Sequence, residues 1–169
     1  FRFAFKDGAL RVAAPAGAIR HGTAGSTLRD AYRHASATFF PPDGKLPDPA
    51  LFAAPQYNTW IELMYDQNQA DVLKYAHAIV DQGFPPEVLM IDDNWQEDYG
   101  KWTFHPGRFP DPKAMMNELH GLGFKVMVWA CPFVSPDCDV YRALAKKGAF
   151  FQEKPGEPAM VKWWNGRSA

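Results

Sequence analysis

The chain has 169 residues, of which 47% are hydrophobic and 22% charged, a composition typical of a folded globular protein and not of a disordered one. Its formal net charge of −1 gives no excess of basic residues for binding nucleic acid or an anionic membrane. No apolar run approaches the length that crosses a bilayer. Aromatic residues are unusually frequent at 15%, and six are tryptophans, which stack well against flat apolar faces such as those of sugar rings.

The first 54 residues differ in character from the rest. Residues 1–12 alternate apolar and polar side chains around Asp7-Gly8, a pattern that predicts a β-hairpin. Residues 13–55 are rich in Ala, Gly, Pro and Thr and predict an irregular linker. We therefore expect residues 1–54 to be the tail of a β-domain followed by a linker, with a second domain from residue 55.

A strand–helix rhythm begins at Gln56. Asn68 with Asp71 three residues later is typical of a helix start, and Asp111-Pro112 is another. The apolar stripes and turn residues predict strands at 59–65, 88–91 and 125–130, and helices from Asn68 to Gly83, from Asp111 to Gly123 and from about Pro136 to Lys147. The segment between the second strand and Pro110 is predicted to be a long polar and aromatic loop.

Strands that alternate with helices through short connections are expected to be parallel, with right-handed crossovers. An open nucleotide-binding sheet carries a Gly-rich turn after its first strand, and residues 64–68 contain no glycine. The pattern therefore favours an α/β fold that forms the first three βα units of an eight-stranded barrel.

The most informative stretch is the apolar strand 88–91, which leads directly into Asp92 and Asp93. Such a strand is buried on both faces, so the carboxylates mark the point where it emerges. Ligands of parallel sheets bind at the carboxyl ends of the strands. Trp60 and Trp129 belong to the neighbouring strand ends, and carboxylates beside indoles are typical of a carbohydrate pocket. The alternative is that the acids cap a turn and the tryptophans fill the core.

Two other roles for Asp92 and Asp93 are less favoured. A divalent cation would take Asn94 or His105 as further ligands, but no other acid cluster at a fixed spacing supports a metal site. Adjacent residues of a strand point to opposite faces, so the two acids would not flank one glycosidic bond as a catalytic pair. We expect neither metal nor other cofactor. Whether Cys131 and Cys138 form a disulfide is left open, because pairing depends on geometry.

Several spaced motifs resemble glycoside hydrolase family 31. Residues 92–113, DDNWQEDYGKWTFHPGRFPDPK, resemble the family's second-strand segment, in which an Asp-rich strand end and an aromatic loop precede a Pro-x-Arg-Phe-Pro-Asp-Pro sequence. Residues 119–129 resemble the following helix and third strand. Residues 162–166, KWWNG, resemble the Trp-x-Gly segment ahead of the fourth strand. The resemblance covers about residues 55–169.

The resemblance implies a (β/α)8 TIM barrel preceded by a β-sandwich, and hydrolysis of α-glycosidic bonds with retention. Residues 1–54 would then be the tail of the sandwich domain plus a linker, and residues 55–169 the N-terminal part of the catalytic barrel, truncated before the fourth strand. The family's nucleophile and acid/base are both Asp, and we expect them beyond Ala169. The chain alone would then be inactive.

Carried over by position, Asp92 would bond the hydroxyls of the sugar in the −1 subsite, where the bond is cleaved. Asp93 and Trp129 would help to line that subsite, Trp164 would close one wall, and Trp60 is a further candidate. The implied partners are an oligosaccharide or α-glycoside substrate and the remainder of the barrel, with no nucleic acid and no membrane. The resemblance also favours a periplasmic or secreted location.

Two positions depart from the family's α-glucosidases, which usually carry an apolar residue at the position of Asp93 and often at that of Trp129. An acid and an indole there would suit a sugar with an axial O4, which favours the α-galactosidase-like subgroup. The alternatives are another sugar-active barrel hydrolase or lyase, and a non-catalytic carbohydrate-binding fragment.

Overall fold

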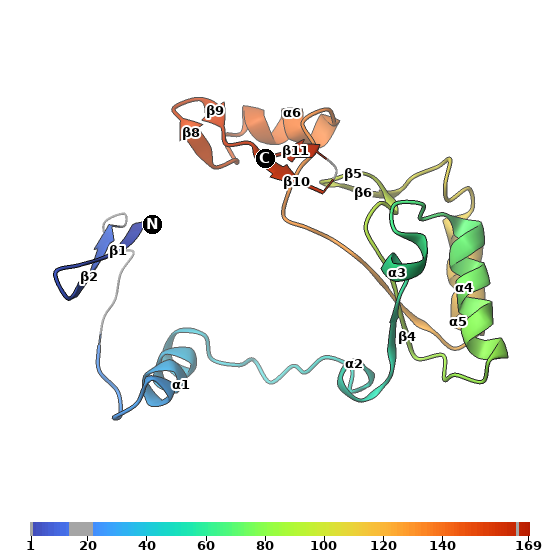
Figure 1. The fold of residues 1–169 in the computed structure, drawn as a ribbon, viewed down its shortest axis with the longest axis horizontal. Helices are drawn as coiled ribbons and strands as arrows, with labels where there is room; N and C mark the ends of the chain where they lie inside the picture. Colours follow the sequence, from blue (N-terminus) through green and yellow to red (C-terminus); the bar gives the residue numbers. More distant parts are fainter. Residues whose placement is uncertain (1, 14–21, 165) are drawn as a thin grey trace. The chain divides into compact units, whose positions relative to one another are not determined.

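The computed structural model describes residues 2–13, 22–164 and 166–169 (Figure 1). The chain divides into two compact units, Phe1–Leu46 and Pro47–Ala169, and each is described here by itself. No helix among the described residues combines the length and the apolar character needed to span a membrane.

The first unit begins with the predicted hairpin. Strand β1 (Arg2–Lys6) pairs antiparallel with β2 (Ala9–Ala13), and Lys6 lies opposite Ala9. Asp7 and Gly8 both have positive φ, 53° and 73°, the conformation of the two-residue turn that matches the twist of a hairpin. The prediction of a hairpin is confirmed.

The segment predicted as an irregular linker contains a helix, α1 (Leu28–Phe39). Thr27 Oγ1 accepts a hydrogen bond from the Asp30 N–H at 3.2 Å, and Asp30 Oδ2 accepts one from the Thr27 N–H at 3.1 Å. This reciprocal pair satisfies two amide groups at the helix start. The Thr27 hydroxyl also donates to Asp30 Oδ2 at 2.8 Å, and this hydrogen bond is the main cause that lowers the pKa of Asp30. The linker prediction was wrong here, and part of its range, residues 14–21, lies outside the described residues.

The second unit is built on a parallel sheet in the order β3-β4-β7. Its strands are β3 (Gln56–Asn58), β4 (Val88–Ile91) and β7 (Lys125–Val128). The parallel arrangement and the α/β class are as predicted. The register places Asn58 beside Met90, and Ile91 beside Val128, so the carboxyl ends of the strands meet at one edge.

The first strand was predicted in the wrong place. Residues 59–65 are not extended: they begin with a short helical turn, α3 (Trp60–Leu63), and the strand is the preceding Gln56–Asn58. The Asn58 side chain explains the change of direction, because its Oδ1 accepts a hydrogen bond from the Trp60 N–H at 2.7 Å. Such local bonds favour a turn over a continued strand.

Helices α4 (Gln69–Asp81) and α5 (Pro112–Gly121) pack against each other and form the core with the sheet. The predicted helix starts are confirmed, since the Asn68 side chain accepts from the Asp71 N–H and the Asp111 side chain accepts from the Ala114 N–H, both at 2.9 Å. Most of the buried residues of this core come from both helices and from the sheet: Val72, Ala76, Ile79, Leu89, Ile91, Met115 and Leu119. Trp95, Phe109 and Phe124 complete it from the connecting segments.

The loop predicted between β4 and α5 contains a hairpin of β5 (Gln96–Asp98) and β6 (Lys101–Phe104), so that prediction was incomplete. After β7 come helix α6 (Asp139–Lys146), the hairpin β8 (Gln152–Lys154) with β9 (Glu157–Pro158), and the hairpin β10 (Val161–Trp163) with β11 (Gly166–Ser168). Helix α2 (Ala50–Ala53) precedes β3.

Candidate active site

The tryptophans and acids singled out in the sequence come together in one pocket of about 330 Å³ at the carboxyl edge of the parallel sheet. Asp92 and Asp93 directly follow β4, Trp129 directly follows β7, Trp60 begins α3, and Trp164 directly follows β10. Two further residues complete the lining, Asn58 and Ile61. Sequence reasoning missed Asn58 because the first strand was placed too late along the chain.

Asp92 is held in a fixed orientation at the end of β4. It is only 8% exposed; its Oδ2 accepts a hydrogen bond from Asn58 Nδ2 at 2.6 Å, and its Oδ1 accepts one from the Asp93 N–H at 2.6 Å. The Asp92 N–H donates to Thr59 Oγ1 at 3.0 Å. Each carboxylate oxygen has room for two donors, so Asp92 keeps acceptor positions for hydroxyl groups in the pocket.

Asp93 is 2% exposed and is held by neutral donors. Its Oδ1 accepts from the Asn94 N–H at 2.7 Å and from Gln96 Nε2 at 3.3 Å, and its Oδ2 accepts from the Tyr99 hydroxyl at 2.5 Å. Among the described residues no cation forms an ion pair with it. A buried carboxylate needs such donors, because burial without them is costly.

Tyr99 is therefore a site residue that the sequence did not reveal. Burial is the main cause that raises the pKa of its phenol well above the ordinary value, and the hydrogen bond to Asp93 adds to the effect. The hydroxyl thus stays protonated and remains a donor to Asp93. Its ring also lies against Trp129, with ring centroids 5.8 Å apart.

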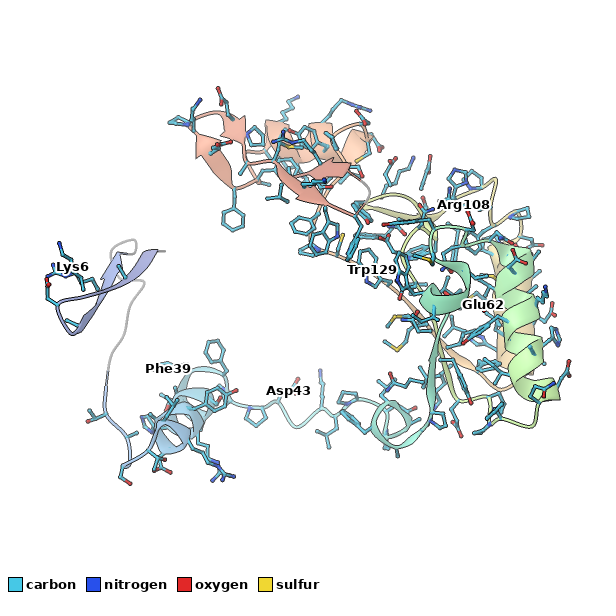
Figure 2. All side chains as sticks on the ribbon, in the orientation of Figure 1. Lys6, Phe39, Asp43, Glu62, Arg108 and Trp129 are labelled. Atoms are coloured by element: carbon cyan, nitrogen blue, oxygen red, sulfur yellow. The ribbon has the colours of Figure 1, made fainter. Side chains whose placement is uncertain are left out.

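Hydrogen bonds to its backbone N–H and carbonyl hold Trp129 at the end of β7. Its N–H donates to the Ile91 carbonyl at 2.9 Å, and its carbonyl accepts from the indole Nε1 of Trp95 at 2.7 Å. Trp95 is buried, and this hydrogen bond links the loop after β4 to the end of β7. Trp129 is labelled in Figure 2.

Arg108 fixes the loop that follows the two acids. Its Nη2 donates to the carbonyls of Asn94 at 2.9 Å and Gln96 at 3.0 Å. Asn94 has a φ of 75°, in the left-handed region that few residues other than glycine adopt, so the loop needs such support. Burial lowers the pKa of the Arg108 guanidinium. Figure 2 labels this side chain.

Trp164 and Trp60 contact each other across the pocket, with ring centroids 6.5 Å apart. Trp60 is also packed edge-to-face on Tyr65 at 5.1 Å, which fixes its ring. The pocket lining therefore combines two carboxylates with three indoles.

Neither a metal site nor a disulfide is found within the described part of the chain. No group of three or more His, Cys, Asp or Glu side chains there is arranged to hold a metal ion. Cys131 and Cys138 are free thiols, and the Cys138 sulfur accepts from the Tyr141 N–H at the start of α6. Burial raises the pKa of Cys131.

Residues 49–169 match the model of the glycosyl hydrolases family 31 TIM-barrel domain. The chain belongs to glycoside hydrolase family 31. The resemblance noted in the sequence is confirmed, and with it the assignment of the second unit to the N-terminal region of the family's catalytic domain. The number of βα units and a preceding β-sandwich stay predictions.

Comparisons with named proteins support this assignment. The myogenesis-regulating glycosidase of Mus musculus is 31% identical over 166 residues, which are 98% of this chain and 23% of that protein. A family 31 α-xylosidase from a soil metagenome, solved with xylose, is 26% identical with a TM-score of 0.57 over 67% of this chain and 16% of that one. The chain thus spans less than a quarter of the length of these relatives.

An α-galactosidase from Thermus thermophilus, solved with p-nitrophenyl α-D-galactopyranoside, shares the fold. Its TM-score is 0.57 at 22% identity, over 67% of this chain and 23% of that one.

We expect Arg108→Ala to lower the free energy of unfolding by about 2–3 kcal/mol, because two partly buried carbonyls lose a charged donor. Urea unfolding monitored by tryptophan fluorescence measures this. Arg142→Ala is the matched control: that guanidinium is exposed and donates to the Asp137 carbonyl at 3.1 Å. Equal losses in the two variants would contradict the role given to Arg108.

The raised pKa of Tyr99 predicts that the free energy of unfolding falls at alkaline pH. Its pKa is raised in the folded chain, so its contribution is complete below the unfolded pKa of about 10 and is lost as the pH rises through the folded value. We expect the wild type to lose up to about 1.4 kcal/mol per pH unit above pH 10 relative to Tyr99→Phe. Unfolding titrations from pH 8 to 11 measure the difference, with Tyr65→Phe as the control. A constant difference across that range would contradict the prediction.

Proposed function

We propose that the chain supplies the sugar-binding part of a retaining α-glycosidase that removes terminal α-linked sugars. The observation that carries the proposal is the single pocket in which Asp92 and Asp93 face Trp60, Trp129 and Trp164. Membership of family 31, whose relatives include α-glucosidases and α-xylosidases, supports the reaction type. Residues 1–54 are then the end of a β-sandwich domain with its connection, and residues 55–169 the first part of the catalytic barrel.

Asp92 is proposed to accept hydrogen bonds from the hydroxyls of the bound sugar. Its carboxylate is oriented by Asn58 and by the Asp93 N–H, and it retains free acceptor positions. The indoles would cover the C–H faces of the ring, since aromatic faces and sugar C–H faces are complementary. The partner is thus an oligosaccharide or α-glycoside.

The catalytic pair is proposed to lie elsewhere in the barrel, on Asp residues beyond Ala169. Retention needs two carboxyl groups roughly 5–5.5 Å apart, flanking the bond that breaks. The pocket's two carboxylates are consecutive residues joined by the hydrogen bond from the Asp93 N–H to Asp92 Oδ1. Tyr99, Gln96 and the Asn94 N–H hold Asp93 from the protein side, as suits a residue that orients substrate.

Within this function we propose α-galactosides as substrates. Among the described residues, Asp93 Oδ2 accepts one protein hydrogen bond, from Tyr99, which leaves a position for a substrate hydroxyl. An axial O4 projects from the face of the ring, and an acid together with the Trp129 indole at these positions would discriminate it from an equatorial one.

Asp92→Asn in the enzyme with its complete barrel is expected to lower kcat/KM by about 100-fold or more on α-galactosides and α-glucosides alike, because charge-assisted bonds to hydroxyls are lost. Hydrolysis of the two aryl glycosides measures this. Asp137→Asn, at an exposed position outside the pocket, is the control. A loss below threefold would overturn the role of Asp92 in binding.

Asp93→Asn is expected to change the ratio of kcat/KM values for α-galactosides and α-glucosides. We expect kcat/KM for the α-galactoside to fall at least about tenfold more than that for the α-glucoside, because one favourable hydrogen bond to O4 is worth roughly that factor. The same two aryl glycosides measure the ratio. An unchanged ratio would contradict the assignment of α-galactoside specificity and leave the glycosidase proposal standing.

A further inference from the structure

Tyr99 lies behind the pocket and contacts two of the residues that line it. It directly follows β5, is 2% exposed, and does not itself belong to the pocket lining. Its hydroxyl donates to Asp93 Oδ2 at 2.5 Å, and its ring lies against Trp129 with 45° between the two ring planes. One side chain thus supports both the acid that follows β4 and the indole that follows β7.

The Tyr99 hydroxyl controls one particular oxygen of Asp93. The other oxygen, Oδ1, accepts hydrogen bonds from the Asn94 N–H and from Gln96 Nε2, which lie close to it in the sequence. Within the described part of the chain, the partner of Oδ2 is Tyr99. A carboxylate oxygen accepts hydrogen bonds along its lone-pair directions, so the donor that fills one direction also determines where the other points. The acceptor position left for a substrate hydroxyl therefore depends on Tyr99.

The backbone of Tyr99 is held by the segment that follows β7. Its N–H donates to Ser135 Oγ at 3.2 Å, and its carbonyl accepts from the Ser135 N–H at 3.0 Å. The buried Cys138 thiol lies 3.8 Å from the same carbonyl. Val134, next to Ser135, exchanges backbone hydrogen bonds with Ala169 at 2.9 and 3.1 Å. The position of the phenol is thus set by segments that lie outside the pocket.

The turn that follows Tyr99 packs closely on the same segment. Gly100 has a φ of 86°, and a Cβ placed on it would lie 2.9 Å from a methyl group of Val134. Both the conformation and the close approach require glycine at this position. The turn of the β5–β6 hairpin is therefore fixed against Val134, which keeps the Tyr99 backbone within hydrogen-bonding distance of Ser135.

We infer that Tyr99 is a positioning residue that determines sugar specificity by directing Asp93 Oδ2 toward a hydroxyl of the bound sugar. The inference rests on the proposed function, because it takes Asp93 to bind O4 of an α-galactoside. Tyr99 acts through Asp93 and not by contact with the sugar, since it lies outside the pocket lining. Loss of its hydroxyl leaves the carboxylate in place and frees its direction, so discrimination between an axial and an equatorial O4 should weaken.

The test uses the enzyme with its complete barrel and compares an aryl α-galactoside with the aryl α-glucoside. Tyr99→Phe removes the hydroxyl and keeps the ring beside Trp129. It is expected to lower the ratio of kcat/KM for the galactoside to that for the glucoside by about fivefold, because a hydrogen bond to a charged acceptor contributes on that order. In the Asp93→Asn background the same change is expected to alter the ratio less than about twofold, since the charged acceptor that the hydroxyl orients is gone.

Tyr57→Phe is the matched control. The Tyr57 hydroxyl also donates a hydrogen bond, to the Pro85 carbonyl at 3.0 Å, and Tyr57 lies outside the pocket. This variant is expected to leave the ratio unchanged. If Tyr99→Phe does not fold, Ser135→Ala takes its place, because it removes the acceptor of the Tyr99 N–H and is expected to lower the ratio about threefold.

The outcomes separate a positioning role from a structural one. Equal losses on both substrates in Tyr99→Phe, or the same change of the ratio with Asp93 and with Asn at this position, would overturn the positioning role. Failure of the wild-type enzyme to hydrolyse either aryl glycoside would overturn the proposed function instead.

Discussion

Two neighbouring carboxylates at the end of a buried strand impose the main constraint on this structure. Removing such groups from water is costly, and the described residues provide no ion pair for either of them. Neutral donors stabilise them instead: the Asn58 amide on Asp92, and Gln96, Tyr99 and the Asn94 N–H on Asp93. These donors come from the end of β3, from the loop after β4 and from the β5–β6 hairpin, so the site depends on all of these segments being in place.

One stretch of sequence accounts for much of that placement. In residues 105–112, Arg108 holds the carbonyls of the loop after the acids, and Phe109 is buried in the core. Asp111 then caps α5 and Pro112 occupies its start, where a proline is well tolerated. The stretch that carried the family resemblance thus couples the core, a helix start and the loop of the site.

The sequence was sufficient where the signal is local or repeats along one element. The caps at Asn68 and Asp111 and the apolar strand 88–91 are read directly from neighbouring residues. The pocket residues could be predicted because parallel strands bring their carboxyl ends together. Helix α1 carried an equally local signal, Thr27 with Asp30, that the abundance of Ala and Gly around it obscured.

The remainder depends on pairing between separate segments. Placing Asn58 beside Asp92 required the register of β3 on β4. The mostly apolar residues 60–64 led to a strand predicted in the wrong position. Tyr99 reaches Asp93 only because the β5–β6 hairpin turns back after Asp98, and its three-residue strand is too short to show a periodic pattern. Neither contact is encoded in a spacing along the chain.

The two acids give the pocket a negative charge, which affects the ligands that can bind there. Its lining combines two acids with an amide, an isoleucine and three indoles, and no basic side chain of the described residues belongs to it. Like charges repel strongly where water is partly excluded, so uronic acids and phosphorylated sugars are disfavoured at this position. Under the proposed function, the two carboxylates that would bind sugar hydroxyls would also select for neutral sugars.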